Sequence, residues 1–210
     1  MGNSLACDLE ALGKFNLPSF ACDAKVSSTD DSSVIRLQKE GFVHVCDQVT
    51  YDISPTSSKF LPEVDVIELR TINRARISLH ADNFRNDRLS RDSRIPNATV
   101  KRFYSEWISN SFGLINKAVY SLESGLCITQ LKQDVLKIDL VSVLEKSKGV
   151  GTRLIRHILA QASEAKVSRV EVTTESDNTG AIKAYTRNGF QEKKRSSCLH
   201  LFHHEKQNSE

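Results

Sequence analysis

Hydrophobic and polar positions follow patterns that divide the second half of the chain into strands and helices. Residues Ile138–Val143 form an apolar run that predicts a strand, and Arg169–Thr174 alternates in the manner of a half-buried strand. An amphipathic helix opens between them, from about residue 149. A shorter helix begins at Asn178 and ends before Gly189, because glycine readily takes the left-handed conformation that follows a helix. Strands and helices therefore alternate through this half, and a last strand follows the second helix.

The middle of the chain carries a similar mixture. A strand is expected at Val64–Arg70, and two paired strands are expected at Ala118–Leu122 and Leu126–Leu131, around a short turn. Between them, a set of apolar residues recurs at helical spacing and predicts a helix over residues 97–111. These residues are Val100, Phe103, Tyr104, Trp107 and Ile108.

A polar segment with a proline and several serines, Asp52–Lys59, is typical of a linker. It predicts two domains, residues 1–60 and 61–210. Within the first, Asp30–Phe42 lines up with Asn178–Phe190 as a helix, a glycine and the start of a strand. The leading unit is therefore either a partial copy of the C-terminal half or a local shape that any helix–glycine–strand unit shares.

The bulk composition is that of an ordinary soluble protein, with 26% charged residues and a net charge of +3. No apolar run approaches the roughly 20 residues of a membrane span, so we expect no membrane association. We also expect no nucleic-acid partner. Five widely spaced cysteines without a C-x-x-C pair fit a reducing compartment and favour a cytoplasmic location. Because His200, His203 and His204 lack other ligands at metal-binding spacing, we expect no metal.

The segment Lys148–Thr152 follows the strand Ile138–Val143 and opens the amphipathic helix. The first N–H groups of a helix have no intrahelical partner, and the positive end of the helix dipole points the same way. Gly149 and Gly151 let a phosphate approach the backbone closely. This pattern predicts an anion site, and it leaves a nucleotide, a dinucleotide and coenzyme A open as ligands.

Two motifs narrow the choice of ligand. Lys146–Gly151 is similar to an Arg/Gln-x-x-Gly-x-Gly/Ala motif, with lysine in place of Arg/Gln, and Asn178–Phe190 matches Asn-x-x-Ala-x-x-x-Tyr-x-x-x-Gly-Phe at every named position. Through these motifs, residues 64–205 resemble the GCN5-related N-acetyltransferase (GNAT) family. The resemblance implies the α/β GNAT fold, with a mixed central sheet flanked by helices, and acetyl-CoA as the acetyl donor.

The resemblance also implies roles for individual residues. Tyr185 is expected to protonate the departing thiolate, which suits a phenol with a high pKa and a hydrogen-bond donor. The alternative is an aromatic ring that fills the apolar face of its helix. Backbone groups of the strand and the glycine turn are expected to bind acetyl-CoA and to polarise its carbonyl. The expected cofactor-binding residues are Leu140, Val141, Val143, Lys148, Gly149, Val150, Gly151, Thr152, Arg153 and Asn178.

A general base must accept the proton of the attacking amine. Asp139 is the catalytic candidate, because strand alternation places it on the same side as Val141, beside the expected attack site. The alternative for Asp139 is a solvated or ion-paired strand residue. Glu68 is a second candidate for the base.

The acceptor is expected to bind an arginine-rich segment. Seven arginines and no lysine lie between Arg70 and Arg94, and guanidinium groups bind phosphates in a bidentate geometry. A solvated basic loop is the alternative. Residues 84–96, followed by Tyr104–Ser111, resemble the dTDP-fucosamine (TDP-amino-dideoxygalactose) acetyltransferases, with Leu89-Ser90 in place of a Phe-His pair.

That closer resemblance implies acetyl transfer to the amino group of a nucleotide-diphosphate amino-deoxy sugar, with dTDP as the nucleotide, for a surface polysaccharide such as lipopolysaccharide. It also implies a small N-terminal partial GNAT-like α/β unit in residues 1–60. The expected substrate-binding residues are Arg88, Arg91 and Arg94. Two other interpretations stay open. One is a GNAT enzyme that acetylates a small amine, an amino acid or a protein N-terminus, and the other is a CoA-binding regulatory module. A homodimer also stays open.

Overall fold

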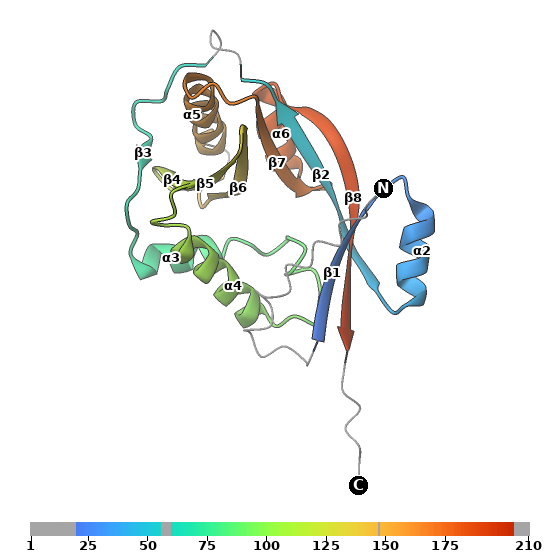
Figure 1. Ribbon diagram of the computed structural model, residues 1–210. Helices are drawn as coiled ribbons and strands as arrows, with labels where there is room; N and C mark the ends of the chain where they lie inside the picture. Colours follow the sequence, from blue (N-terminus) through green and yellow to red (C-terminus); the bar gives the residue numbers. More distant parts are fainter. Residues whose placement is uncertain (1–19, 56–59, 147, 204–210) are drawn as a thin grey trace.

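One mixed β-sheet runs through the residues that this computed structural model describes, which are 20–55, 60–146 and 148–203. Its strand order is β1-β8-β2-β7-β6-β5-β4-β3 (Figure 1). The strands are β1 (Phe20–Ser27), β2 (Val43–Ile53), β3 (Ile67–Glu68), β4 (Lys117–Leu122), β5 (Gly125–Lys132), β6 (Val135–Val143), β7 (Arg169–Glu175) and β8 (Gln191–His203). The helices are α2 (Asp31–Lys39), α3 (Arg74–Ala81), α4 (Asn97–Asn110), α5 (Val150–Glu164) and α6 (Thr179–Arg187).

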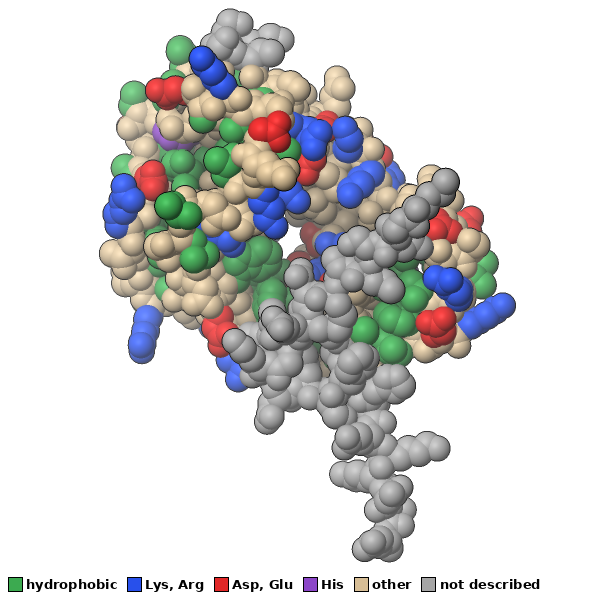
Figure 2. Space-filling model, in the orientation of Figure 1, with side chains coloured by type: hydrophobic (Ala, Val, Ile, Leu, Met, Phe, Trp, Pro, Cys, Tyr) green, Lys and Arg blue, Asp and Glu red, His purple; other side chains and the backbone are tan. Residues whose placement is uncertain are grey.

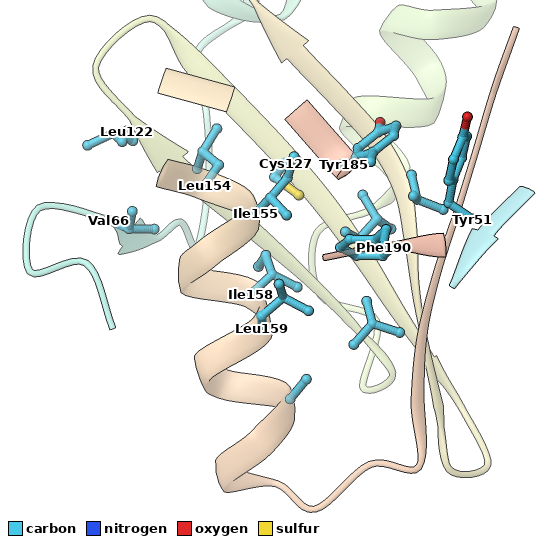
Figure 3. Packing of buried hydrophobic residues seen from close by; sticks show 14 of the residues in the cluster. Tyr51, Val66, Leu122, Cys127, Leu154, Ile155, Ile158, Leu159, Tyr185 and Phe190 are labelled. Carbon is cyan, nitrogen blue, oxygen red and sulfur yellow. The ribbon is translucent and has the colours of Figure 1, made fainter. Parts of the chain in front are cut away.

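Two hydrophobic cores cover opposite faces of this sheet. Cys127 of β5 belongs to the core beneath α5 and α6, together with Leu154 and Ile158 of α5 (Figure 3). Its neighbours Leu126 and Ile128 belong to the core beneath α3 and α4. Successive residues of a strand point to opposite faces, so α5 and α6 lie on one face and α3 and α4 on the other. Helix α4 confirms the helix predicted at residues 97–111.

Strands β6 and β7 separate toward their carboxyl ends. They are parallel and pair only between Val135–Ile138 and Arg169–Val172. Beyond this, β6 continues along β5 to Val143, while β7 continues along β2 to Glu175. The two carboxyl ends are therefore not joined to each other, and an opening forms in the sheet between them.

A β-bulge changes the orientation of the side chains in β6. Ile128 of β5 pairs with Leu140 while the next residue, Thr129, pairs with Ile138, so Asp139 is an extra residue in its strand. The prediction that Asp139 and Val141 share a face is wrong. Val141 packs against the core beneath α5, whereas Asp139 lines a cavity beside Trp107 of α4, on the opposite face.

The N-terminal strands belong to the same sheet as the rest of the chain. Strand β2 lies between β7 and β8 and is antiparallel to both, and β1 pairs with the outer side of β8. Helix α2 and helix α6 each end at a glycine with positive φ, +94° at Gly41 and +89° at Gly189. The two similar segments thus lead into neighbouring strands, β2 and β8. The division into domains at residue 60 stays a prediction, and the sheet extends across it.

Candidate active site

The start of α5 lies directly after the opening between β6 and β7. Gly149 is the N-cap residue and has a left-handed backbone, with φ of +78°. The backbone N–H of Arg153 donates to the carbonyl oxygen of Gly149 at 3.0 Å, which is the first hydrogen bond of the helix. The N–H groups of Val150, Gly151 and Thr152 therefore precede that bond and have no partner within the helix. They point to the same end of the helix as the positive pole of its dipole.

Arg153 does not belong to this group of free N–H donors, contrary to the sequence prediction. Its N–H is used within the helix, because it occupies the fourth position after the N-cap. Its guanidinium forms ion pairs with Glu63 at 3.0 Å, Asp65 at 3.0 Å and Glu123 at 3.2 Å. Arg153 therefore holds the segment before β3 and the β4–β5 turn against α5.

The glycines leave room for a ligand above the helix start. A β-carbon placed on Gly149 would meet no atom within 4 Å, and one placed on Gly151 would lie 3.4 Å from Cγ2 of Val143. The side chain of Val150 is buried in the core, and Lys148 is exposed and paired with Glu145. The start of α5 therefore presents backbone groups, and their binding of a cofactor stays a prediction.

The opening itself is lined by the backbone of β6. The side chain of Leu140 packs in the core beneath α4, and those of Val141 and Val143 pack in the core beneath α5. A ligand can therefore reach only backbone groups on the side of β6 that faces away from β5, because β5 pairs with these residues on the other side. One of these is already engaged, because Asn83 Nδ2 donates to the carbonyl oxygen of Val143 at 3.2 Å.

Tyr185 of α6 is buried beneath the opening, with 5% of its surface exposed. Its ring packs beside Tyr51 and Phe190, at centroid distances of 6.2 and 5.9 Å. In Figure 3 its hydroxyl points away from Phe190. Burial, assisted by the nearby Cys127 and Glu175, raises the pKa of the Tyr185 hydroxyl well above its usual value. The phenol is therefore a protonated donor at neutral pH, and packing and proton donation are compatible in this residue.

Asn178 caps α6. Its Oδ1 accepts from the N–H of Ala181 at 3.2 Å, and its Nδ2 donates to Oγ1 of Thr174 at 3.1 Å. The side chain thereby ties the helix that carries Tyr185 to the end of β7. Its predicted contact with the cofactor stays a prediction.

Asp139 forms an ion pair with Lys117 at 3.2 Å, which matches the alternative that the sequence left open. Its carboxylate lines a cavity of about 160 Å³ together with Trp107, Glu171 and Thr173. Glu68 lies elsewhere, on the edge strand β3, which β4 and β5 separate from β6. The structure therefore keeps Asp139 near the opening and removes Glu68 from it.

The predicted substrate-binding arginines all pair with carboxylates of the protein. Arg88 pairs with Asp23 of β1. Arg91 pairs with Asp177, just after β7, at 2.7 Å. Arg94 pairs with Asp92 at 2.7 Å and lies over the ring of Phe202, 4.6 Å from its centroid. These contacts fix the segment 82–96 against β1, β8 and the end of β7, so it is not a solvated basic loop.

Two residues near the opening were missed in the sequence. Glu175 ends β7 and is 9% exposed, and Gln48 lies opposite it on β2 and is 8% exposed. Glu175 could have been found, because it is a carboxylate at the end of a predicted strand, just before the Asn178 motif. Gln48 could not have been found from the sequence, because Glu175, to which it donates, lies 127 residues away in the chain.

Across the described ranges, no cluster of three or more His, Cys, Asp or Glu side chains could hold a metal ion. Among these same residues, no helix has the length and apolarity that a membrane crossing requires.

Comparisons with known proteins agree with this geometry. The model of the Acetyltransferase (GNAT) family matches residues 120–190, which contain β5 to α6. No curated protein matches the chain.

Solved structures share the fold at low sequence identity. A GCN5-related N-acetyltransferase from Sphaerobacter thermophilus superposes with a TM-score of 0.60 and 16% identity, over 86% of this chain and 59% of that one. A conserved protein of unknown function from Staphylococcus epidermidis has a TM-score of 0.61 and 17% identity, over 87% of this chain and 72% of that one. A GCN5-related N-acetyltransferase from Kribbella flavida has a TM-score of 0.54 and 15% identity, over 85% and 67%.

The chain thus spans less than two thirds of the length of the Sphaerobacter structure. Its sheet, its flanking helices and the separation of β6 from β7 confirm the predicted GNAT fold. Residues 120–190 thus match the GNAT acetyltransferase family, and the fold of the chain is similar to that of GNAT structures.

Proposed function

We propose that this protein is an acetyl-CoA-dependent N-acetyltransferase. The observation that carries the proposal is the opening between β6 and β7, with the unbonded N–H groups of Val150, Gly151 and Thr152 at its end. A pyrophosphate suits this site, because helix N-termini bind anions through free N–H groups and the dipole. Figure 2 shows a hollow in the middle of one face of the molecule, with Lys and Arg side chains gathered along its upper edge.

Acetyl-CoA supplies an activated acetyl thioester. The free edge of β6 offers backbone groups to the thioester and its pantetheine arm. Tyr185 offers a hydroxyl that is protonated at neutral pH and donates no hydrogen bond to another described residue. A donor of this kind can protonate the leaving thiolate. These roles support an acyl transfer to an amine.

A matched pair of glycine variants tests acetyl-CoA binding. Gly149 and Gly113 both have φ of +78°, and a β-carbon on either would meet no atom within 4 Å. Gly149→Val and Gly113→Val therefore impose a similar backbone strain, but only the first places a side chain over the start of α5. We expect calorimetry to show acetyl-CoA binding in Gly113→Val and none in folded Gly149→Val. Equal affinities in the two variants would refute the proposed site.

We further propose that the acceptor substrate is a nucleotide-diphosphate amino sugar. The arginine-rich segment supports it by its position, since Arg88 N–H donates to Glu175 at the end of β7. The pairing of Arg88, Arg91 and Arg94 with carboxylates limits this support, because a diphosphate would compete with those partners. A small amine or a protein N-terminus is the second candidate.

The acceptor is tested by comparing a dTDP-linked amino sugar with the same amino sugar lacking the nucleotide. Arg91→Ala is the informative variant, because its guanidinium is partly exposed and its partner Asp177 lies on the surface. We expect the KM for the nucleotide-linked sugar to rise in Arg91→Ala and with added salt, while the KM for the free sugar changes little. Equal changes for the two acceptors would favour the small-amine substrate.

A further inference from the structure

Glu175 is a buried carboxylate that makes no direct ion pair, although it interacts electrostatically with Arg91. It lies at the carboxyl end of β7, where β7 has separated from β6, and 9% of its surface is exposed. Within the described part of the chain, no Lys, Arg or His side chain forms an ion pair with it. By contrast, Asp139 and Glu171 on the same side of the sheet pair with Lys117 and Arg169. A buried carboxylate outside a direct ion pair is costly, so this arrangement points to a function.

The hydrogen bonds of Glu175 leave one oxygen free. Its Oε1 accepts from Gln48 Nε2 at 3.1 Å and from the N–H of Arg88 at 3.3 Å. Its Oε2 accepts no hydrogen bond from another described residue. The carboxylate is therefore held in place through one oxygen, and the other oxygen is available to a proton.

Glu175 and Tyr185 lie on opposite sides of the sheet. Strand alternation puts Glu175 on the face of Thr173, which lines the cavity beside Trp107. Tyr185 belongs to the core beneath α5 and α6. The two groups could therefore act on opposite sides of the reacting thioester, one on the amine and the other on the thiolate.

We propose that Glu175 is the general base of the acetyl transfer and that Gln48 is the residue that positions it. This inference rests on the proposed function. The nitrogen of a neutral amine forms a bond to the acetyl carbon, and the carbon–sulfur bond breaks. The amine proton moves to Oε2 of Glu175, and the thiolate takes the proton of Tyr185. Transfer of the proton from Glu175 to the Tyr185 phenolate, through water, restores both groups and leaves an acetamide and the CoA thiol.

The proposal gives the N-terminal segment a part in the active site. Gln48 belongs to β2, which enters the sheet from residues 43–53 and lies beside β7 in antiparallel register, with Gln48 opposite Glu175. Without this strand, Glu175 would lose a buried hydrogen bond and its fixed orientation. A hydrogen bond to a charged group is stronger than one between neutral groups, so Gln48 helps to fix where the carboxylate points.

The test compares Glu175→Gln with wild type in a release assay for the CoA thiol. The acceptors are a dTDP-linked amino sugar, glucosamine, spermidine and a peptide with a free N-terminus. Glutamine keeps an acceptor oxygen for Gln48 and Arg88, so the fold is expected to persist. We expect kcat to fall by roughly 10²–10⁴, the range for removing a general base, with the calorimetric affinity for acetyl-CoA unchanged. Glu192→Gln, on the exposed part of β8, is the matched control and should retain full activity.

Two further variants keep the proposal falsifiable. Gln48→Leu should lower kcat about tenfold or more, while the KM for acetyl-CoA stays unchanged. Asp139→Asn should lower kcat less than Glu175→Gln does. Near-normal kcat in Glu175→Gln, or a larger loss in Asp139→Asn, would overturn the assignment of Glu175 while the acetyltransferase function stands. Near-normal kcat in Gln48→Leu would overturn the positioning role of Gln48. A wild-type protein that neither binds acetyl-CoA nor releases thiol with any of the acceptors would overturn the function and the base together.

Discussion

Gly125 supports the start of α5, and replacing it should disturb both stability and acetyl-CoA binding. It is the first residue of β5, and a β-carbon built on it would lie 2.6 Å from Cγ1 of Val150 and 2.7 Å from Cδ1 of Leu154. Both contacted residues are almost fully buried on α5. The carbonyl oxygen of Leu122 would lie 3.1 Å from the same β-carbon. A methyl group in Gly125→Ala therefore has no free space, and the first turn of α5 must shift.

The expected cost follows from the overpacking of a dense core. Inserting an extra carbon into such a site typically costs about 1–3 kcal/mol. Because the three nearest atoms belong to two buried side chains and a backbone carbonyl, we expect about 2 kcal/mol for Gly125→Ala. That corresponds to roughly a 30-fold shift of the folding equilibrium toward the unfolded chain. The same displacement moves the N–H groups at the start of α5, so the affinity for acetyl-CoA should fall as well.

Urea unfolding measures the first effect and calorimetry the second. The matched control is Gly180→Ala in α6, where the nearest atom to the new β-carbon is Oδ1 of Asn178 at 3.9 Å. There we expect a gain of up to about 1 kcal/mol, because alanine favours the helix over glycine. If Gly125→Ala unfolds at the wild-type urea concentration or higher, with an unchanged slope, the packing argument is refuted.

Three other predictions follow from the buried polar groups. Tyr185→Phe should keep the affinity for acetyl-CoA and lower kcat by roughly 10²–10⁴; near-normal kcat, with chemistry rate-limiting, would make this ring a packing residue only. Arg88→Ala leaves the largely buried carboxylate of Asp23 without its cation and should lower the free energy of unfolding by about 3 kcal/mol. Addition of Asp23→Asn should recover part of that loss in urea unfolding, and an unchanged midpoint in the single variant would contradict the prediction. Burial lowers the pKa of His80 to about 4, against about 6.5 in an unfolded chain, so the unfolded chain binds the proton first and stability falls as the pH decreases between these values. The advantage of wild type over His80→Gln should therefore shrink by up to about 3 kcal/mol between pH 7 and pH 4, and a difference that does not vary with pH would show that His80 titrates normally.

The sequence alone determined the parts of this protein that depend on near neighbours in the chain. Periodicity predicted α4, α5 and the strands around them, because each element is set by its own pattern of apolar positions. The glycine turn at Gly149 and the cap at Asn178 could also be predicted, since a helix start requires particular residue types within a few positions. The position of Tyr185 followed from the same short segment.

Only the tertiary structure decided which distant residues meet. It placed β2 between β7 and β8, and so brought Gln48 to Glu175. It put a bulge at Asp139, which turned that side chain to the face opposite Val141. It also gave each arginine of the 88–94 segment a carboxylate partner, where the sequence showed only the arginines. The physical reason is the same in each case: strand register and side-chain pairing depend on packing between segments far apart in the chain, and local periodicity carries no information about them.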